Sequence, residues 1–283
     1  FAIFIQRDKS VKEAAKIHDQ KAKKTEQTSQ AAQKENEIEE ETEGTEEETG
    51  DRDASVPDRS NFAVQPGVPV GTTEQSDEKI VYLTLDDGPS DNTQAVLDIL
   101  DKYNAKATFF VTGEMPEYKD MIKAAYDKGH TIGMHTYSHD YAKVYASVDA
   151  YFQDLDQIGQ MVQEEIGYVP CFVRFPGGSS NTVSKKYTAG IMSTLVQEVQ
   201  NRGYQYYDWN GSSGDGSVRT TEELVAQATS FDSNNIILLC HDSHGKQTTV
   251  EALPQIIEHY QSLGYTFKAL DRDSFVAHHG VNN

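Results

Sequence analysis

The sequence has few cationic residues relative to its anionic ones: 25 Lys and Arg stand against 45 Asp and Glu, and the formal net charge is −20. Proteins that bind nucleic acid draw much of their affinity from clustered Lys and Arg. The same side chains attract a protein to an anionic membrane surface. The charge balance therefore argues against nucleic acid and anionic lipid as partners, and it leaves an uncharged or cationic glycan compatible.

Cysteines and long apolar runs are also scarce. Cys171 and Cys240 are the two cysteines, each in an apolar run, so we expect buried free thiols rather than a disulfide or metal ligands. Residues 1–5 are apolar, but five residues cannot span a bilayer. This short run is compatible with the end of a membrane tether upstream of Phe1, which would suit an extracellular, cell-surface enzyme. No partner protein is predicted.

Aromatic residues are almost absent from residues 1–79, and carboxylates dominate residues 35–53. A segment so poor in apolar side chains cannot bury enough surface to offset the entropy lost on ordering. We therefore predict a disordered acidic linker over residues 1–79 and a folded domain over residues 80–283.

Residues 80–283 alternate between short β-branched or aromatic runs and longer amphipathic stretches, the pattern of repeated strand–helix units. Strands are expected at residues 80–85, 107–112, 131–134, 172–175, 204–209, 236–240 and 266–270. Helices are expected at residues 93–103, 118–128, 148–166, 185–202, 221–229 and 250–263. The prediction is an α/β fold, a distorted or incomplete (β/α) barrel of about seven strands.

Barrels of this kind place reactive groups at the carboxyl ends of their strands. Polar residues collect at five such positions in this sequence: Asp86 and Asp87, His135 and His139, Arg174, Asp215, and His241. Five clusters at five strand ends indicate a reaction site rather than packing alone.

The first two clusters suit a metal centre. Two adjacent carboxylates, Asp86 and Asp87, do not both ionise cheaply in a confined site unless one binds a cation and the other accepts a proton. His135 and His139 stand four residues apart, which one helical turn would bring to the same side. Two imidazoles and one carboxylate supply three ligands for zinc and leave a position for water or substrate, as in catalytic zinc sites.

These motifs resemble those of the NodB-homology polysaccharide deacetylases, carbohydrate esterase family 4, over about residues 80–270. Thr-Leu-Asp86-Asp87-Gly is similar to the family's Thr-Phe-Asp-Asp-Gly. The stretch from His135 to His139 meets His-(Ser/Thr)-x-x-His in full, and Leu-Cys-His241 meets Leu-x-His. In this order the motifs are specific, and they imply a NodB-like barrel.

Two further motifs depart from the family pattern. Arg-x-Pro-Tyr is present as Arg174-Phe-Pro-Gly177, so glycine keeps the backbone N–H but gives up an aromatic side chain. For Asp-x-x-Asp-Trp, both Asp208 and Asp215 offer a carboxylate. We expect Asp215, beyond the predicted strand, to be the partner of Arg174, and Trp209 to be a core residue. The substrate pocket should then be more open, or be completed by other residues.

The resemblance implies a divalent metal, with Zn2+ favoured and Co2+ an alternative, held by Asp87, His135 and His139. It also implies a set of groups that act around this metal: the general base Asp86, the general acid His241, Arg174 and Asp215 that orient the base, and the oxyanion donor Gly177.

The implied activity is hydrolysis of the N-acetyl group of N-acetylglucosamine units in a polysaccharide, with release of acetate. Peptidoglycan is favoured because of the expected surface tether. Acetyl-xylan and chitooligosaccharides stay open as substrates, because amide- and ester-cleaving members share these motifs. A serine esterase is disfavoured, since no Gly-x-Ser-x-Gly is present. A non-enzymatic glycan-binding protein is the distant third, since every catalytic residue type is retained.

Overall fold

The computed structural model describes Arg59 and residues 61–283. Residues 1–58 and 60 of the predicted disordered linker lie outside the described residues. This part includes the acidic run and the apolar residues 1–5.

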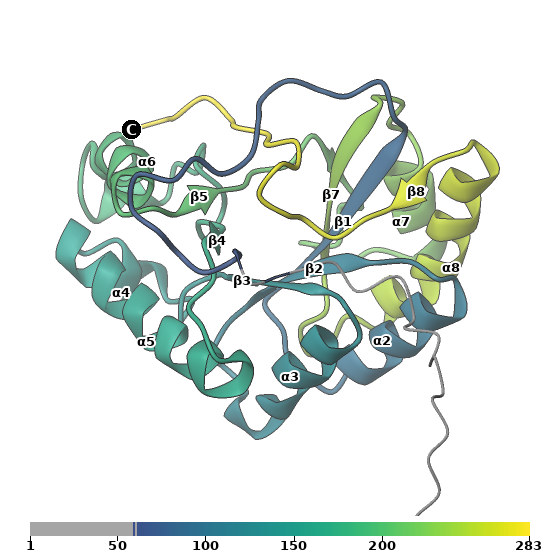
Figure 1. The fold of residues 1–283 in the computed structure, drawn as a ribbon, viewed down its shortest axis with the longest axis horizontal. Coiled ribbons are helices and arrows are strands. Elements are labelled where there is room, and N and C mark those ends of the chain that lie inside the picture. Colours follow the sequence, from purple (N-terminus) through teal and green to yellow (C-terminus); the bar gives the residue numbers. More distant parts are fainter. Residues whose placement is uncertain (1–58, 60) are drawn as a thin grey trace, which may run out of the picture. The chain divides into compact units, whose positions relative to one another are not determined.

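The described residues form one curved, parallel sheet in the order β5-β4-β3-β2-β1-β7-β6, and β8 pairs with the first residues of β1 (Figure 1). The strands are β1 Ile80–Asp86, β2 Ala107–Val111, β3 Thr131–Met134, β4 Phe172–Val173, β5 Gln205–Tyr206, β6 Gly211–Ser212, β7 Asn235–His241 and β8 Thr266–Phe267. Because β5 and β6 are the two ends of the path, the barrel is open between them. The predicted incomplete (β/α) barrel is confirmed.

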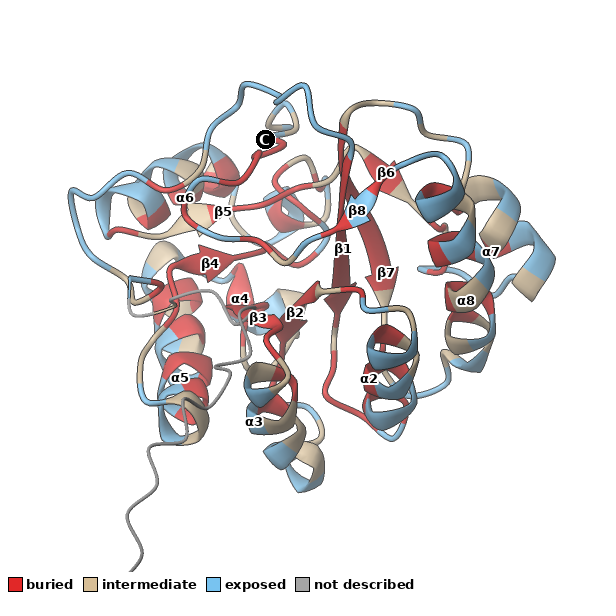
Figure 2. Ribbon diagram, turned by 45° about the vertical axis from the view of Figure 1, so that its right-hand side comes forward, coloured by how far each residue is buried: buried red, intermediate tan, exposed pale blue. Residues whose placement is uncertain are grey.

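Helices cover the outer face of the sheet (Figures 1 and 2). They are α2 Thr93–Lys102, α3 Asp120–Asp127, α4 Tyr141–Val144, α5 Val148–Ile166, α6 Ile191–Asn201, α7 Thr221–Ala228 and α8 Gln247–Ser262, with short 3-10 turns at Pro116–Tyr118 and Ser184–Lys186. Helix α5 begins where the Ser147 side chain accepts from the Ala150 N–H, and it ends at Gly167 with φ 90°. Its buried residues recur every three or four positions, which turns one face to the sheet.

Strand alternation divides the core into two layers. Val81, Leu83 and Leu85 of β1 belong to the outer layer, between sheet and helices. Tyr82 belongs to the inner layer, which fills the barrel together with side chains from β2, β4 and β7. Since Asp86 stands four residues beyond Tyr82, the same alternation directs it to the inside of the barrel. The strand thus delivers a carboxylate to the barrel interior at its carboxyl end.

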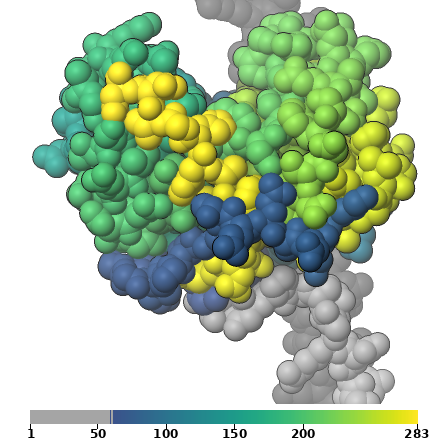
Figure 3. Space-filling model, turned by 90° about the horizontal axis from the view of Figure 1, so that it is seen from above, coloured from purple at the N-terminus to yellow at the C-terminus, as the bar shows by residue number. Residues whose placement is uncertain are grey.

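The folded part begins earlier than the predicted boundary at residue 80. Phe62 is 4% exposed and its ring meets Phe172 edge-on, with ring centroids 5.2 Å apart. Val70 is also buried. Figure 3 shows this segment beside the C-terminal tail, where the Val276 N–H donates to the Thr72 carbonyl (2.8 Å). The assignment of residues 61–79 to a linker is therefore wrong, because its few apolar side chains pack into the inner layer of the core.

Several elements differ in length from the prediction. Strands β4 and β5 have two residues each, whereas four and six were expected, and β6 and α4 were not predicted. The chain nevertheless stays extended past β4, since the Tyr207 N–H donates to the Val173 carbonyl and the Arg174 N–H to the Met134 carbonyl, each at 2.9 Å. Cys171 and Cys240 are buried and free, as predicted.

Candidate metal and catalytic site

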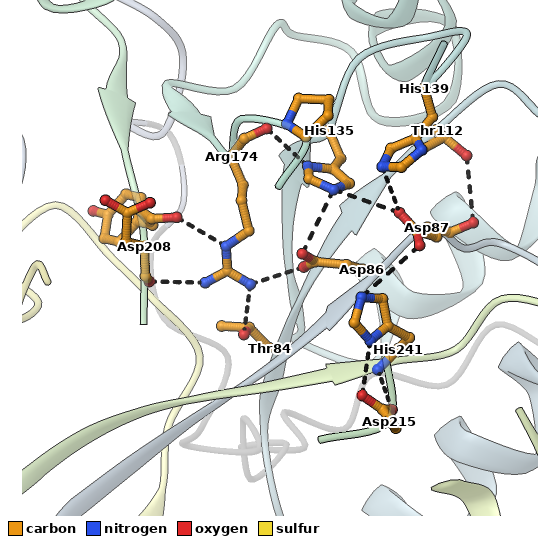
Figure 4. A network of polar contacts seen from close by, with 12 residues as sticks. Thr84, Asp86, Asp87, Thr112, His135, His139, Arg174, Asp208, Asp215 and His241 are labelled. Atoms are coloured by element: carbon orange, nitrogen blue, oxygen red, sulfur yellow. Dashed lines mark hydrogen bonds and ion pairs between the residues drawn. The ribbon is translucent and has the colours of Figure 1, made fainter. Parts of the chain in front are cut away.

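The predicted site residues converge at the carboxyl ends of the strands (Figure 4). Asp86 is the last residue of β1, His135 follows β3, Arg174 follows β4, and His241 ends β7. Neighbouring parallel strands end at the same edge of a sheet, so residues far apart in the sequence meet there. The polar network in Figure 4 joins all of these side chains.

Asp87, His135 and His139 form the metal-ligating cluster that the sequence predicts, with one potential ligand atom from each lying within 4.8 Å of the others. The Oδ1 atom of Asp87 is 3.4 Å from Nε2 of His135 and 3.3 Å from Nε2 of His139. This buried oxygen has no hydrogen-bond partner within the described residues. A buried oxygen without a partner, facing two imidazole nitrogens, fits a site for a cation.

His135 is held in the form that a metal ligand requires. Its Nδ1 lies 2.8 Å from the Arg174 carbonyl oxygen, which can only accept, so Nδ1 carries the proton and Nε2 presents its lone pair to the cluster. Burial lowers the pKa of His135, and this effect prevails over the opposing charges of Asp86 and Asp87. The imidazole is therefore neutral at physiological pH.

The backbone of this cluster is strained. Asp87, Thr136 and His139 have φ values of 69°, 72° and 47°, in a region that residues other than glycine rarely adopt. Such conformations persist where the surrounding structure fixes them, and they concentrate at functional sites. The predicted helical turn between the two histidines is therefore wrong, because an irregular loop with two left-handed residues brings the rings together. Their centroids are 5.0 Å apart.

Asp154 of α5 holds this loop in place, and the sequence analysis missed it. Its carboxylate accepts from the backbone N–H groups of Tyr137 and Ser138 and from the Ser138 hydroxyl (2.6 Å). A signal was available in the sequence. Asp154 stands three residues after Tyr151 and four before Ile158, which places a carboxylate beside the apolar stripe of its helix.

Arg174 orients Asp86 from inside the barrel. Its guanidinium is fully buried and donates from Nη1 to Oδ1 of Asp86 at 2.8 Å. Further bonds from the guanidinium reach the Thr84 hydroxyl and the carbonyl groups of Tyr207 and Asp208. These contacts fix the planar fork, so Oδ1 of Asp86 is anchored while Oδ2 lies 3.6 Å from Nε2 of His135.

The structure pairs Asp215 with His241, so the expected pairing of Asp215 with Arg174 is wrong. Oδ1 of Asp215 is 2.8 Å from Nδ1 of His241, and Oδ2 accepts from the His241 N–H and the Thr249 hydroxyl. The strand order explains the difference. Asp215 follows β6, which pairs with β7, whereas β4 and Arg174 lie on the other side of β1.

Asp208, the alternative partner of Arg174, contributes its carbonyl group instead of its carboxylate. Its carboxylate accepts from the N–H of Ser179 (2.8 Å), the Ser179 hydroxyl and the N–H of His279 (2.8 Å). The carboxylate thus joins the loop after Gly177 to the C-terminal tail. Trp209, expected in the core, is only partly buried and lies against His279, with ring centroids 4.8 Å apart.

His241 completes the site on the far side of the cluster, where its Nε2 lies 3.9 Å from Oδ2 of Asp87. Burial favours the neutral ring, but the hydrogen bond and charge of Asp215, with the charges of Asp86 and Asp87, raise the pKa of His241 to about 9. The imidazole therefore carries a proton at neutral pH. A protonated group in this position can act as a general acid.

Asp242 lies beneath the Asp86-Asp87-Gly88 turn and was also missed. Its Oδ2 accepts from the Thr93 hydroxyl at 2.7 Å, and burial raises its pKa to about 7. A Cβ atom added to Gly88 would lie 2.3 Å from Oδ1 of Asp242, so the turn needs glycine there. The position directly after the Leu-x-His motif was the available signal.

Comparison with known proteins agrees with this geometry. A family model described as polysaccharide deacetylase matches residues 73–196. A peptidoglycan-N-acetylglucosamine deacetylase of Bacillus cereus is 30% identical over 226 residues, which cover 74% of this chain and 78% of that protein. The chain belongs to the polysaccharide deacetylase family. These enzymes are metal-dependent hydrolases of the N-deacetylase type, and the motif resemblance is confirmed.

Two further relatives show the breadth of the family. A chitin deacetylase of Arthroderma benhamiae is 36% identical over 182 residues, which cover 62% of this chain and 46% of that protein. The solved catalytic domain of a peptidoglycan N-acetylglucosamine deacetylase from Eubacterium rectale is 46% identical, with a TM-score of 0.72, and the match covers 75% of this chain and 97% of that domain.

Proposed function

We propose that this polysaccharide deacetylase removes the N-acetyl group from N-acetylglucosamine units of peptidoglycan. The observation that carries the proposal is the placement of a held base and a held acid on two sides of one three-ligand cluster. Asp86 is anchored by Arg174 at 2.8 Å, and His241 by Asp215 at 2.8 Å. The relatives from Bacillus cereus and Eubacterium rectale, both named for this reaction, support peptidoglycan as the polymer.

Asp87, His135 and His139 would hold the divalent metal. A set of two imidazole nitrogens and one carboxylate favours zinc, and Co2+ suits the same ligands. When bound, such an ion lowers the pKa of a coordinated water and polarises a carbonyl group. The neutral form of His135 and the free lone pairs of Asp87 prepare the protein for it.

The protein's own groups move the protons of the reaction. Oδ2 of Asp86 accepts a proton from the attacking water, while Arg174 on Oδ1 keeps the carboxylate in place. As the C–N bond breaks, Nε2 of His241 gives its proton to the sugar nitrogen, which leaves as an amine while acetate is released. Asp215 on Nδ1 holds the ring with Nε2 toward the cluster. The N–H of Gly177, which takes part in no hydrogen bond within the described residues, would hold the oxyanion.

A peptidoglycan substrate implies an extracellular site of action, and we propose the cell surface. The acidic composition is compatible with an uncharged or partly cationic glycan. Within the described residues, none of the helices has both the length and the apolar character needed to cross a bilayer.

Acetate release from three polymers tests the proposal: peptidoglycan, chitooligosaccharides and acetyl-xylan. We expect release from peptidoglycan to be fastest, and an Asp86→Asn variant that keeps the wild-type melting temperature to lose roughly a hundredfold or more in rate on all three. A preference for acetyl-xylan would identify an O-deacetylase instead. A wild-type protein that releases acetate from none of them, with zinc or cobalt supplied, would refute the enzymatic function.

A further inference from the structure

Glycine stands at the position where the third motif of the family has an aromatic residue, and another aromatic side chain lies directly against it. A Cβ atom added to Gly177 would lie 2.8 Å from the hydroxyl oxygen of Tyr141 and 3.4 Å from a ring carbon of the same residue. Gly177 also has φ 77°, which disfavours any side chain there. Tyr141 therefore occupies space beside the oxyanion loop that a side chain at position 177 would need.

Tyr141 is positioned by several contacts rather than by one. It begins helix α4, whose N-cap Asp140 accepts from the Ala142 N–H. Tyr145, which directly follows the last residue of α4, donates from its hydroxyl to the Pro176 carbonyl at 2.7 Å and so ties the end of α4 to the loop that contains Gly177. The Tyr141 ring meets the His139 ring edge-on at 5.7 Å. The aromatic side chain is thus fixed between a metal ligand and the oxyanion donor.

The hydroxyl of Tyr141 is available to a ligand. Tyr141 is only partly buried, and the side-chain hydrogen bonds at the two ends of α4 are made by the cap residues Asp140 and Tyr145; within the described residues the Tyr141 hydroxyl makes none. In the proposed reaction the acetyl carbonyl is bound by the cluster and the Gly177 N–H. The group left for the Tyr141 hydroxyl is the sugar ring that bears the acetamide.

We propose that Tyr141 is the residue that recognises this sugar: its ring forms the wall that Gly177 cannot provide, and its hydroxyl donates a hydrogen bond to a sugar oxygen. This inference rests on the proposed deacetylase function. Helix α4 would thus complete the sugar pocket, for which the motifs of this chain provide no aromatic side chain at position 177. A neutral phenol suits an uncharged sugar, since it adds no charge to a site that already contains two carboxylates and a protonated imidazole.

The test compares a substrate with a sugar to one without. Tyr141→Phe keeps the ring and removes the hydroxyl, so kcat/KM on an N-acetylglucosamine oligomer should fall roughly 3- to 10-fold, the size of one neutral hydrogen bond. Tyr141→Ala should lose more, roughly 30-fold or beyond, because the wall is removed as well. For 4-nitrophenyl acetate, which has no sugar, Tyr141→Phe should stay within about twofold of wild type, since its reacting acetyl group meets the same groups.

Two other tyrosines provide matched controls. Tyr103→Phe removes an exposed hydroxyl that bonds to Glu258 and should leave kcat/KM unchanged on both substrates. Tyr145→Phe removes the buried bond to Pro176 and should lower both rates together with the melting temperature. In an inactive Asp86→Asn background, Tyr141→Phe should weaken binding of the same oligomer by a similar factor, a readout that does not depend on turnover.

Three outcomes would overturn the inference. Tyr141→Phe could keep full activity on the oligomer and full affinity for it, which would mean that the hydroxyl does not bind the sugar. It could instead lose activity equally on both substrates, which would indicate a structural role like that of Tyr145. If the wild-type protein deacetylates no glycan at all, the proposed function fails, and this inference fails with it. Wild-type activity on the oligomer separates the two kinds of failure.

Discussion

Replacing Asp215 with Asn tests the assignment of His241 as the general acid. The substitution keeps the size of the side chain but removes the negative charge that lies 2.8 Å from Nδ1 of His241. In the wild-type protein the pKa of His241 is raised from 6.5 to about 9, against the effect of burial, with Asp215 as the main raising influence. Without that charge the pKa of His241 should fall toward its ordinary value of 6.5, because burial favours the neutral ring and only the charges of Asp86 and Asp87 remain to oppose it.

The sign and size of the effect follow from protonation. His241 must be protonated to act as an acid, so activity declines as pH rises through its pKa. At pH 8 the protonated fraction would fall from roughly 90% with a pKa of 9 to about 3% with a pKa of 6.5. The variant should thus lose about 30-fold in kcat/KM at pH 8 from protonation alone, and little at pH 5.5, where roughly 90% remains protonated. The alkaline limb of the profile should move to lower pH.

The assay is kcat/KM on a soluble N-acetylglucosamine oligomer from pH 5 to pH 10 at saturating metal. Asp208→Asn is the matched control, because it also removes a buried carboxylate near the site, but one that bonds to Ser179 and His279 rather than to His241. Asp208→Asn should leave the alkaline limb in place. An alkaline limb unmoved in Asp215→Asn, or moved equally in Asp208→Asn, would refute the reasoning.

Three further predictions concern the metal, the two adjacent carboxylates and the N-terminal segment. Chelation should abolish acetate release, and added zinc or cobalt should restore it, whereas full activity of a metal-stripped sample would contradict the proposed site. Asp87→Asn should lose bound metal and turnover together. Asp86→Asn should keep its metal but lose roughly 10² to 10⁴ in rate, which excess metal does not restore; bound zinc and turnover measured on both variants would reveal reversed roles. Phe62→Ala should lower the free energy of unfolding by about 3 to 5 kcal/mol, because it empties a buried position in the barrel, and an unchanged denaturation midpoint would show that the segment does not support the fold.

The metal cluster and the fold class could be predicted because their signals are local. Strand β3 has its predicted bounds, and Asp87, His135 and His139 lie within short motifs whose chemistry limits what they can do. The partner of Asp215 could not be predicted, since it depends on β7 pairing with both β1 and β6. The order of strands in a sheet does not follow from the sequence of any single segment.

Features formed by distant segments escaped prediction for a similar reason. Phe62 belongs to an apolar run of only three residues, too short to show periodicity, and its ring partner, Phe172, lies more than a hundred residues away in the sequence. Tyr141 belongs to none of the motifs, and its place in the site depends on contact with Gly177, which lies 36 residues further along the chain. In the loop between the two histidines, Thr136 and His139 adopt left-handed backbone conformations. Residues other than glycine adopt that conformation only rarely, so the sequence does not predict it.

The burial of Arg174 and Asp86 means that added salt should affect this ion pair less than it affects charges at the surface. Mobile ions screen charges at the surface within about 8 to 10 Å at physiological ionic strength, but they screen charges inside a protein much less. The side chains of this pair are 0% and 3% exposed, so salt in the surrounding solution weakens the attraction between the two charges very little. The net charge of −20, by contrast, acts through solvent on any charged polymer that approaches. We therefore expect ionic strength to affect the approach of a charged polymer more than it affects the anchoring of Asp86 by Arg174.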